Sequence, residues 1–188
     1  MHSSCATNQN RENHLVLYRR NYVIGGTYFF TVTLRDRSAT LLCDHIDLLR
    51  QAYENTVRQQ PFTTDAIVIL PEHLHAIWTL PQGDMDYSSR WRAIKAMFSR
   101  SLRQAGVEPN RNSRGEATVW QRRFWEHTVR DDLDFVRHVN YIHWNPVKHG
   151  HALTPADWPN STFHRFVKDG RLAANWGGKD IDGDFGES

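Results

Sequence analysis

The sequence predicts an α+β domain in which helices pack on an antiparallel sheet. Short runs rich in aromatic and β-branched residues are typical of strands, and longer stretches repeat their apolar residues at the spacing of a helix. The two kinds of segment alternate along the chain. With 188 residues, 39% of them hydrophobic, the chain is long enough to bury the core of one domain.

The predicted elements follow the order strand, helix, strand, strand, helix, strand, helix. This β-α-β-β-α-β-α order is the split βαβ, ferredoxin-like pattern with a helix added at its end. Asp44 is a candidate N-cap of the first helix, Ser88 or Ser89 of the second, and Asp131 or Asp132 of the last. The predicted strands are residues 28–34, 64–70, 73–80 and a segment within 119–130, and the predicted helices run from 45 to about 60, from 88 to about 104 and from 131 to about 145.

Each predicted helix has an apolar stripe, with neighbouring members three or four residues apart, that indicates one buried face. The side chains expected inside on this ground are Ile46, Leu49, Tyr53 and Val57 in the first helix, Trp91, Ile94, Phe98 and Leu102 in the second, and Leu133, Val136, Val139 and Ile142 in the last.

The two ends of the chain differ in composition from its middle. Residues 1–13 are polar and are expected to form a disordered arm, and residues 177–188 to form a flexible acidic tail, with a single domain over 14–176. No apolar run approaches the ~20 residues that a membrane span needs, and the N-terminus has no apolar signal-peptide core. We therefore expect a cytoplasmic protein without membrane contact.

Charge is distributed unevenly along the chain. The net charge is +2, but residues 179–188 contribute −3, so the remainder has a net charge of +5. Most of the basic side chains are arginines, whose planar guanidinium suits phosphate. No acidic residue falls between Tyr87 and Gly106. We expect this block and nearby basic residues to contact DNA phosphates, the alternative being a solvated helix face; the candidates are Arg19, Arg20, Arg90, Arg92, Lys95, Arg100, Arg103, Arg122 and Arg123.

Two histidines begin the predicted third strand. Side chains alternate along a strand, so His73 and His75 share a face, roughly 7 Å apart along the chain. Two imidazoles on one face can bind one metal ion. The alternative is a pair of histidines satisfied by neighbouring polar groups, and for this short motif alone it is the more frequent case.

The predicted last helix adds a phenol and an amide. Tyr141 and Asn145 are four residues apart and share one helix face. Pro146 disfavours helical backbone at Asn145, so the helix should end there, with the Tyr141 phenol projecting from the surface. The alternatives are a tyrosine that packs its ring and wets its hydroxyl, and an asparagine that caps the helix.

These side chains together suit a catalytic metal. His73, His75 and Asn145 offer two nitrogens and one oxygen, and they leave coordination positions open for water and a phosphate. No thiolate belongs to the set, so Mg²⁺ or Mn²⁺ is expected instead of zinc. Glu126, His127 and His143 are candidate general bases for Tyr141, each equally well explained as structural.

The motifs resemble those of the REP-associated tyrosine transposases, a branch of the insertion-sequence-200-like, single-tyrosine HUH transposases. HUH denotes His, hydrophobic, His, which is His73-Leu74-His75 here. The family tyrosine is followed four residues later by Asn or Gln and often then by Pro, as in Tyr141 to Pro146, and Asn is typical of this branch. The stretches RRNYVIGGTYFFTVTLRDR and VWQRRFWEHTVRDD are also similar, and the resemblance covers about residues 18–165.

The resemblance implies a ferredoxin-like HUH-nuclease fold and action on single-stranded DNA at the hairpin of a repetitive extragenic palindrome (REP), with a guide tetranucleotide beside it. Tyr141 would attack the phosphorus and leave a 5′-phosphotyrosine and a free 3′-hydroxyl. A catalytically silent hairpin-binding regulator, a replication-initiator or relaxase nickase and a structural zinc protein remain alternatives. The sequence leaves open whether the protein is a monomer or a homodimer.

Overall fold

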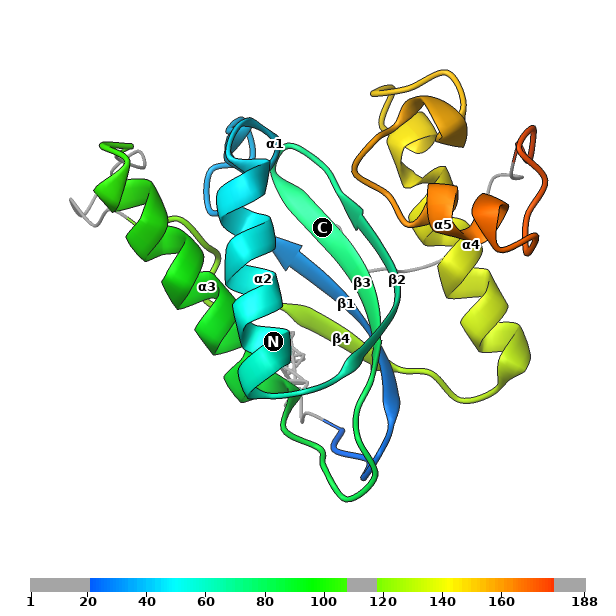
Figure 1. Cartoon of the computed structure of the whole chain (residues 1–188), viewed down its shortest axis with the longest axis horizontal. Helices are drawn as coiled ribbons and strands as arrows, with labels where there is room; N and C mark the ends of the chain where they lie inside the picture. The colour runs from blue at the N-terminus through cyan, green and yellow to red at the C-terminus, as the bar shows by residue number, and fades with distance from the viewer. Residues whose placement is uncertain (1–20, 108–117, 178–188) are drawn as a thin grey trace, which may run out of the picture.

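A computed structural model describes residues 21–107 and 118–177. Within them, the four strands β1 (Thr27–Thr33), β2 (Thr63–Ile69), β3 (His73–Thr79) and β4 (Trp125–Thr128) form a sheet in the order β2-β3-β1-β4 (Figure 1). Every neighbouring pair is antiparallel. The predicted α+β class, with an antiparallel sheet and packed helices, is confirmed.

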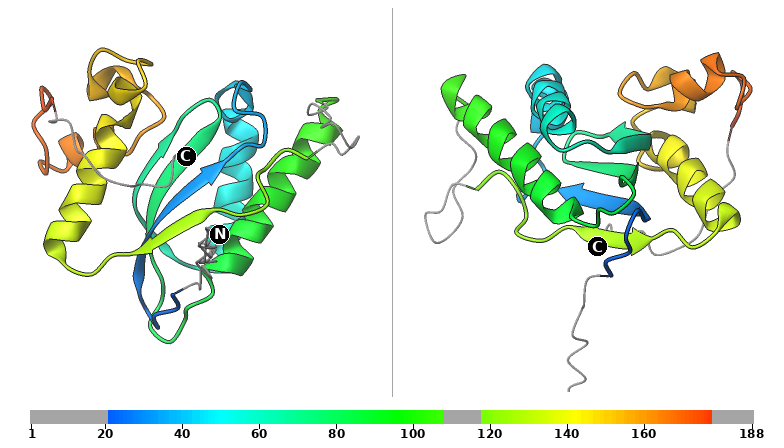
Figure 2. Two further views of the ribbon diagram at one scale, coloured as in Figure 1. Left: turned by 180° about the vertical axis from the view of Figure 1, so that it is seen from behind. Right: turned by 60° about the horizontal axis from the view of Figure 1, so that its bottom comes forward.

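Helices cover both faces of this sheet. α2 (Ile46–Gln59) and α3 (Tyr87–Gln104) pack on one face, and α4 (Asp132–Lys148) packs on the other (Figure 2). The described residues also form three short helices: α1 (Leu41–Asp44) lies between β1 and α2, and η1 (Pro155–Asp157) and α5 (Phe163–Lys168) follow α4.

The larger core lies under α2 and α3. There, Trp78 of β3 stacks on Trp91 of α3 with ring centres 4.1 Å apart. The predicted stripe of α3 is fully buried, which confirms that part of the helix prediction, and the stripe of α2 packs against the same core. The buried members of the α3 stripe are Trp91, Ile94, Phe98 and Leu102.

The smaller core lies between the sheet and α4. Because side chains alternate along β3, Leu74 and Trp78 belong to the larger core, whereas Ile77 packs with α4. His73 and His75 share the face of Ile77. This alternation places both histidines under α4.

Two of the predicted helix starts are wrong. Asp44 does not cap α2 but ends α1, and its carboxylate accepts a hydrogen bond from the Thr40 hydroxyl. α3 begins at Tyr87, one residue before the earlier of the two candidate caps, because the Asp86 carboxylate accepts from the Ser89 backbone N–H. The predicted cap of α4 at Asp131 is confirmed, with its carboxylate accepting from the Asp134 N–H.

α4 differs from the prediction in its rotation and its length. Leu133 and Val136 are 83% and 51% exposed, although the spacing predicted them inside; Val139 and Ile142 are buried as predicted. The side facing the sheet is the more polar one. Pro146 does not end the helix, which continues to Lys148.

The outer edge of β2 is covered by a segment from the C-terminal third of the chain. The Ile69 N–H donates to the Asn160 carbonyl and the Thr162 N–H donates to the Ile67 carbonyl, on either side of a bridge between Val68 and Ser161. The predicted arm at 1–13 and all but one residue of the predicted tail at 177–188 lie outside the described residues. In the part described, no helix is both long and apolar enough to span a bilayer.

Candidate functional site

The two histidines of β3 face α4 from beneath it. The ring centres of His73 and His75 are 4.9 Å apart, and the two side chains are 1% and 0% exposed. Buried polar groups are normally hydrogen-bonded, so the partners of each imidazole nitrogen indicate what the ring can do.

Each imidazole is held at Nδ1 by a neighbour. The Glu72 carboxylate is 2.8 Å from His73 Nδ1, and the Thr31 hydroxyl is 2.9 Å from His75 Nδ1. His73 Nε2 is buried and has no hydrogen-bond partner among the described residues. A metal-binding histidine characteristically directs one nitrogen to a carboxylate or other acceptor and leaves the other for the ion. His73 fits a metal ligand on this observation.

The site favours neutral imidazole. Burial, with His73 and His149 nearby, lowers the pKa of His75 well below its usual value. Burial would raise the pKa of the Glu72 carboxyl, but the hydrogen bond and electrostatic attraction of His73, together with smaller contributions from a backbone hydrogen bond and Arg37, lower the pKa overall. His75 is therefore uncharged at neutral pH, which is the form that binds metals.

Tyr141 of α4 lies against the imidazole of His75. Its ring centre is 5.2 Å from that of His75 and 6.0 Å from that of Phe29. The side chain is 1% exposed, so the expectation of a phenol projecting from the surface is wrong. The physical reason is the rotation of α4, which turns the tyrosine face of the helix toward the sheet.

Asn145 follows Tyr141 by about one helical turn and is fully buried. The helix face with the phenol therefore also contains the amide. His73, His75, Tyr141 and Asn145, which come from β3 and α4, thus lie in the layer between the sheet and that helix.

Two residues of this region were missed from the sequence. Lys148 Nζ donates to the Tyr141 hydroxyl at 3.2 Å and lies 4.8 Å from the centre of the same ring. His149 places its ring 5.2 Å from that of His73. Burial lowers the pKa of Lys148, and burial together with His73 and Lys148 lowers the pKa of His149 to about 4. The sequence signal that could have identified them was the basic pair Lys148-His149 after Pro146. It was overlooked because the helix was expected to end at Asn145.

Two of the three candidate general bases lie elsewhere. Glu126 pairs with Phe30 in the sheet and approaches the Tyr87 hydroxyl at 3.3 Å, on the side of α3. His143 points to α5, where it packs on Phe166 with ring centres 4.7 Å apart. Burial lowers the pKa of His143 to about 3. Neither side chain is brought to the Tyr141 hydroxyl.

A scan against models of protein families gave no match. A protein of Escherichia coli (strain K12), described as a REP-associated tyrosine transposase, is 47% identical over 170 residues, which are 90% of this chain and 96% of that protein. A similarly named relative from Haemophilus influenzae (strain ATCC 51907 / DSM 11121 / KW20 / Rd) is 45% identical over 163 residues, 86% and 93% of the two chains. The chain belongs to the family of REP-associated tyrosine transposases.

A solved structure supports the same placement. It is a REP-associated tyrosine transposase bound to a REP hairpin, it has a TM-score of 0.82 and 47% identity to this chain, and the match covers 91% of this chain and 96% of the other. The fold of this family member therefore agrees closely with that of a relative solved with hairpin DNA.

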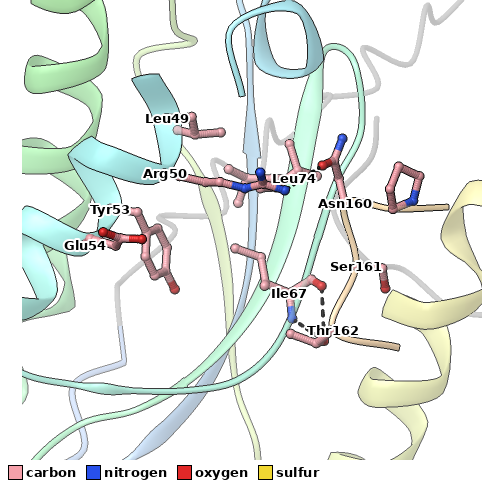
Figure 3. A pocket seen from close by; sticks show the side chains of 11 residues that line it. Leu49, Arg50, Tyr53, Glu54, Ile67, Leu74, Asn160, Ser161 and Thr162 are labelled. Carbon is pink, nitrogen blue, oxygen red and sulfur yellow. Dashed lines mark hydrogen bonds between the residues drawn. The ribbon is translucent and has the colours of Figure 1, made fainter. Parts of the chain in front are cut away.

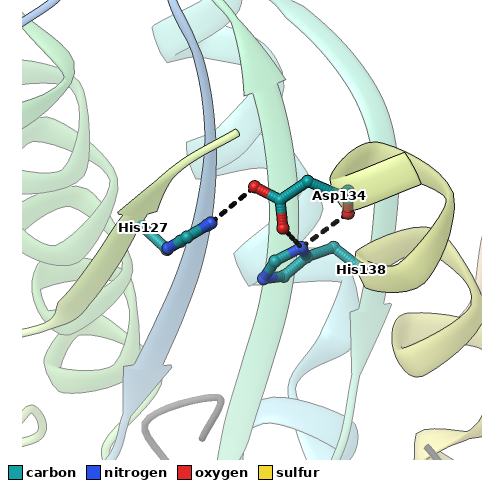
Figure 4. Close-up of side chains that lie close together, drawn as sticks. All are labelled: His127, Asp134 and His138. Atoms are coloured by element: carbon teal, nitrogen blue, oxygen red, sulfur yellow. Dashed lines mark hydrogen bonds and ion pairs between the residues drawn. The ribbon is translucent and has the colours of Figure 1, made fainter. Parts of the chain in front are cut away.

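The third candidate base belongs to a second polar cluster. His127 Nε2 and Asp134 Oδ2 are 2.8 Å apart, and His138 Nδ1 is 3.2 Å from the other carboxylate oxygen (Figure 4). These ligand atoms lie within 4.8 Å of one another, so the cluster could hold a metal ion. However, His138 Nδ1 is also 2.8 Å from the backbone carbonyl of Asp134, so it bears a proton in this arrangement. The cluster is satisfied by hydrogen bonds and joins β4 to α4.

The candidate DNA contacts of this family member fall into three groups. Arg90 is 3% exposed and its guanidinium binds the Gln60 and Pro61 carbonyls and the Asp84 carboxylate, so it is a structural residue and not a surface cation. Lys95 is half-buried, and its Nζ donates to the Gln121 carbonyl at 2.6 Å. The exposed candidates are Arg92, Arg100 and Arg103 on α3 and Arg122 and Arg123 before β4, whereas Arg19 and Arg20 lie outside the described residues.

A cavity of about 300 Å³ opens between α2, β2 and residues 159–162 (Figure 3). Its walls are largely apolar, with Arg50, Glu54 and Asn160 at their polar parts. Leu74 lines it, so the cavity lies on the side of the sheet that His73 and His75 do not face. It contains none of the predicted site residues.

Proposed function

We propose that this protein is a metal-dependent endonuclease and strand transferase for single-stranded DNA, which cleaves beside REP hairpins through a 5′-phosphotyrosine on Tyr141. The observation that supports this best is the contact between Tyr141 and His75, with ring centres 5.2 Å apart. This contact sets the proposed nucleophile beside one of the proposed metal ligands, although β3 and α4 are distant in sequence.

The metal would be held by His73, His75 and Asn145, of which His73 has a buried nitrogen without a hydrogen-bond partner among the described residues. When bound, Mg²⁺ or Mn²⁺ supplies Lewis-acid polarisation of the scissile phosphodiester. Asn145 adds a hard oxygen and no thiolate is present, which favours these two ions over zinc.

The chemical step belongs to the tyrosine. The Tyr141 oxygen forms a bond to phosphorus, and the bond between phosphorus and the 3′ oxygen of the preceding nucleotide breaks. The phenol loses one proton to water and the departing 3′ oxygen gains one. The resulting 3′-hydroxyl can attack a phosphotyrosine in the reverse direction, so strands are joined without ATP.

The partner is proposed to be DNA with a hairpin next to a single strand, as a relative was solved with a REP hairpin. The exposed arginines of α3 would neutralise phosphates. They lie on the opposite face of the sheet from Tyr141 (Figure 2), so a bound DNA has to pass around an edge of the sheet to reach both. Tyr141 meets His75 of its own chain, which supports a site assembled within a monomer.

The test uses one hairpin oligonucleotide with a single-stranded extension, labelled at its 5′ end in one sample and at its 3′ end in another. With Mn²⁺ or Mg²⁺, the 3′-labelled strand should become linked to the protein through denaturation, and the 5′-labelled strand should be released shorter with an extendable 3′-hydroxyl. A chelator should abolish both products.

Tyr141→Phe is the matched control, because it removes only the hydroxyl. It should bind the hairpin as well as the wild type and form no adduct. An adduct from Tyr141→Phe would exclude Tyr141 as the nucleophile. Tight binding by the wild type without any cleavage would favour the second candidate function, a protein that only binds the hairpin. The 1% exposure of Tyr141 also favours this second candidate.

A further inference from the structure

Lys148 is the cation nearest to the proposed nucleophile in the described part of α4. Its Nζ donates a hydrogen bond to the Tyr141 hydroxyl at 3.2 Å, and it lies 4.8 Å from the centre of the tyrosine ring. Lys148 follows Tyr141 by seven residues, about two turns, so the two side chains lie above one another on one face of the helix.

Lys148 contacts the oxygen of Tyr141 on which negative charge must develop during the attack. A free phenol has a pKa of ~10, so at neutral pH it is protonated and a weak nucleophile. As the oxygen attacks phosphorus, its proton leaves and the oxygen becomes partly anionic. Fixed donors and positive charges directed at such an oxygen lower the barrier.

Two aromatic side chains of the described residues also contact the Tyr141 ring, and neither is a permanent cation. His75 on β3, with its ring centre 5.2 Å from that of Tyr141, is assigned to the proposed metal ion and is not a donor of positive charge itself. Phe29 on β1 contributes only its ring. Glu126 and His143, which the sequence offered as general bases, face α3 and α5 instead.

We propose that Lys148 is a further catalytic residue, whose ammonium stabilises the negative charge on the Tyr141 oxygen while this oxygen attacks, and again when it departs from phosphorus. The ammonium keeps its protons throughout. The phenol proton passes to water, the bond from Tyr141 to phosphorus forms as the bond from phosphorus to the 3′ oxygen breaks, and the 3′ oxygen takes a proton from water. This inference rests on the proposed function.

The test compares neutral and charged replacements in the full chain. Lys148→Met keeps the length of the side chain and removes the charge, Lys148→Gln is a second neutral variant, and Lys148→Arg keeps the charge. Lys168→Met is the matched control, since Lys168 is an exposed lysine at the end of α5 and losing it changes the net charge equally. Single-turnover cleavage, rejoining from a purified adduct, hairpin affinity and Mn²⁺ affinity are measured for each.

The neutral variants should cleave and rejoin about 100-fold more slowly, the lower end of the range for losing one charge-stabilising donor. Their hairpin and Mn²⁺ affinities should stay within about threefold of wild type. Lys148→Arg should recover at least part of the rate in both directions, and Lys168→Met should behave as wild type. A purely structural role would not give rates that depend on charge at unchanged affinity.

The outcomes separate the two proposals. If the wild type forms an adduct and Lys148→Met and Lys148→Gln form it at the wild-type rate, the inference about Lys148 is overturned and the proposed function stands. If the wild type forms no adduct with Mg²⁺ or Mn²⁺, both are overturned. A neutral variant whose slow cleavage follows only from weakened hairpin binding also overturns the inference.

Discussion

Single hydrogen bonds determine which nitrogen each site histidine presents. The Thr31 hydroxyl is 2.9 Å from His75 Nδ1, and the Glu72 carboxylate is 2.8 Å from His73 Nδ1. Nδ1 is engaged in each ring, and the Nε2 of His73 is buried without a hydrogen-bond partner among the described residues. In the proposed site, Thr31 and Glu72 would thus orient the two metal-binding histidines without touching the ion themselves.

Replacing Thr31 with valine tests this orientation, because valine keeps the shape and removes the hydroxyl. The variant should bind Mn²⁺ about 10- to 100-fold more weakly, the range seen when such supporting partners are removed. Calorimetric titration measures the affinity. Thr56→Val, on α2 in the other core, is the control for a buried threonine and should bind as wild type. Equal affinities of the two variants would contradict the assignment.

The identity of a residue did not determine its environment. Arg90 belongs to the basic block that the sequence assigned to DNA, yet it is 3% exposed and bound to carbonyls and Asp84. The chain between α2 and β2 passes over α3 at that point, and its carbonyls need a donor. Contacts of this kind depend on backbone from distant parts of the chain. The spacing of residues along a helix does not predict them.

At the scale of elements, the decisive feature is how α4 lies on the sheet. Spacing alone favoured the side with Leu133 and Val136, and both are exposed. The buried side includes Asp134, His138 and Tyr141, which are polar or amphipathic. An apolar stripe predicts the buried side of a helix only when no other side has partners on the sheet. The side of α4 with His138 and Tyr141 has such partners, because it meets His75 and Phe29 of the sheet.

The end of α4 shows a second limit of prediction from sequence. Proline removes one N–H and disfavours helix before it, which placed the expected end at Asn145. The helix continues because Pro146 is buried and the following N–H groups find acceptors, as His149 does at the Asn145 carbonyl. The final turn brings Lys148 over Tyr141, so the misplaced boundary concealed a residue of the site.

The Asp134 carboxylate should stabilise the attachment of α4 to β4 in a pH-dependent way. Burial would raise the pKa of this carboxyl, but hydrogen bonds from His127 and the Arg130 N–H outweigh it and lower the pKa to about 2. A carboxyl whose pKa is lower in the folded state stabilises fully above about pH 4, and this contribution is lost as the pH falls toward 2.

Asp134→Asn should therefore lower the free energy of unfolding by about 1 to 3 kcal/mol at pH 7, and by less at pH 3. Urea unfolding at both pH values measures the difference. Asp132→Asn, at an exposed position in the first turn of the same helix, should cost only a few tenths of a kcal/mol. A deficit of Asp134→Asn that is the same at both pH values would contradict the prediction.

At the scale of the whole molecule, the proposed DNA-binding arginines of α3 and the proposed nucleophile of α4 belong to helices on opposite faces of the sheet. α3, which bears three of the exposed arginines, and α4, which bears Tyr141, pack on opposite faces of the sheet (Figure 2). Such a separation implies that affinity and cleavage respond to different substitutions.

The double variant Arg92→Gln with Arg103→Gln tests the binding surface. It should bind hairpin DNA more weakly, and its slope of log affinity against log salt should be shallower by about 0.9 for every phosphate that is no longer neutralised. Binding is measured over a series of salt concentrations. Arg58→Gln with Lys168→Gln removes the same charge at exposed positions on α2 and α5 and should keep the wild-type slope. Identical slopes for both double variants would exclude DNA binding by Arg92 and Arg103.

Much of the fold followed from local composition. Strand segments such as residues 28–34 and 73–80 are recognisable because β-branched and aromatic residues cluster in them, and the order of elements restricts the sheet to few arrangements. The pairing of His73 with His75 followed from the alternation of side chains. Contacts between distant segments, such as that of residues 160–162 with β2, have no local signal and were not predicted.

That pairing of residues 160–162 with β2 also limits how copies of this protein can associate. The backbone of residues 160–162 already uses hydrogen-bonding groups along the outer edge of β2. An unprotected edge is where a sheet is most easily extended by a strand from another molecule. Growth of the sheet from the β2 side is therefore blocked, and two copies that meet must do so through helices or another surface.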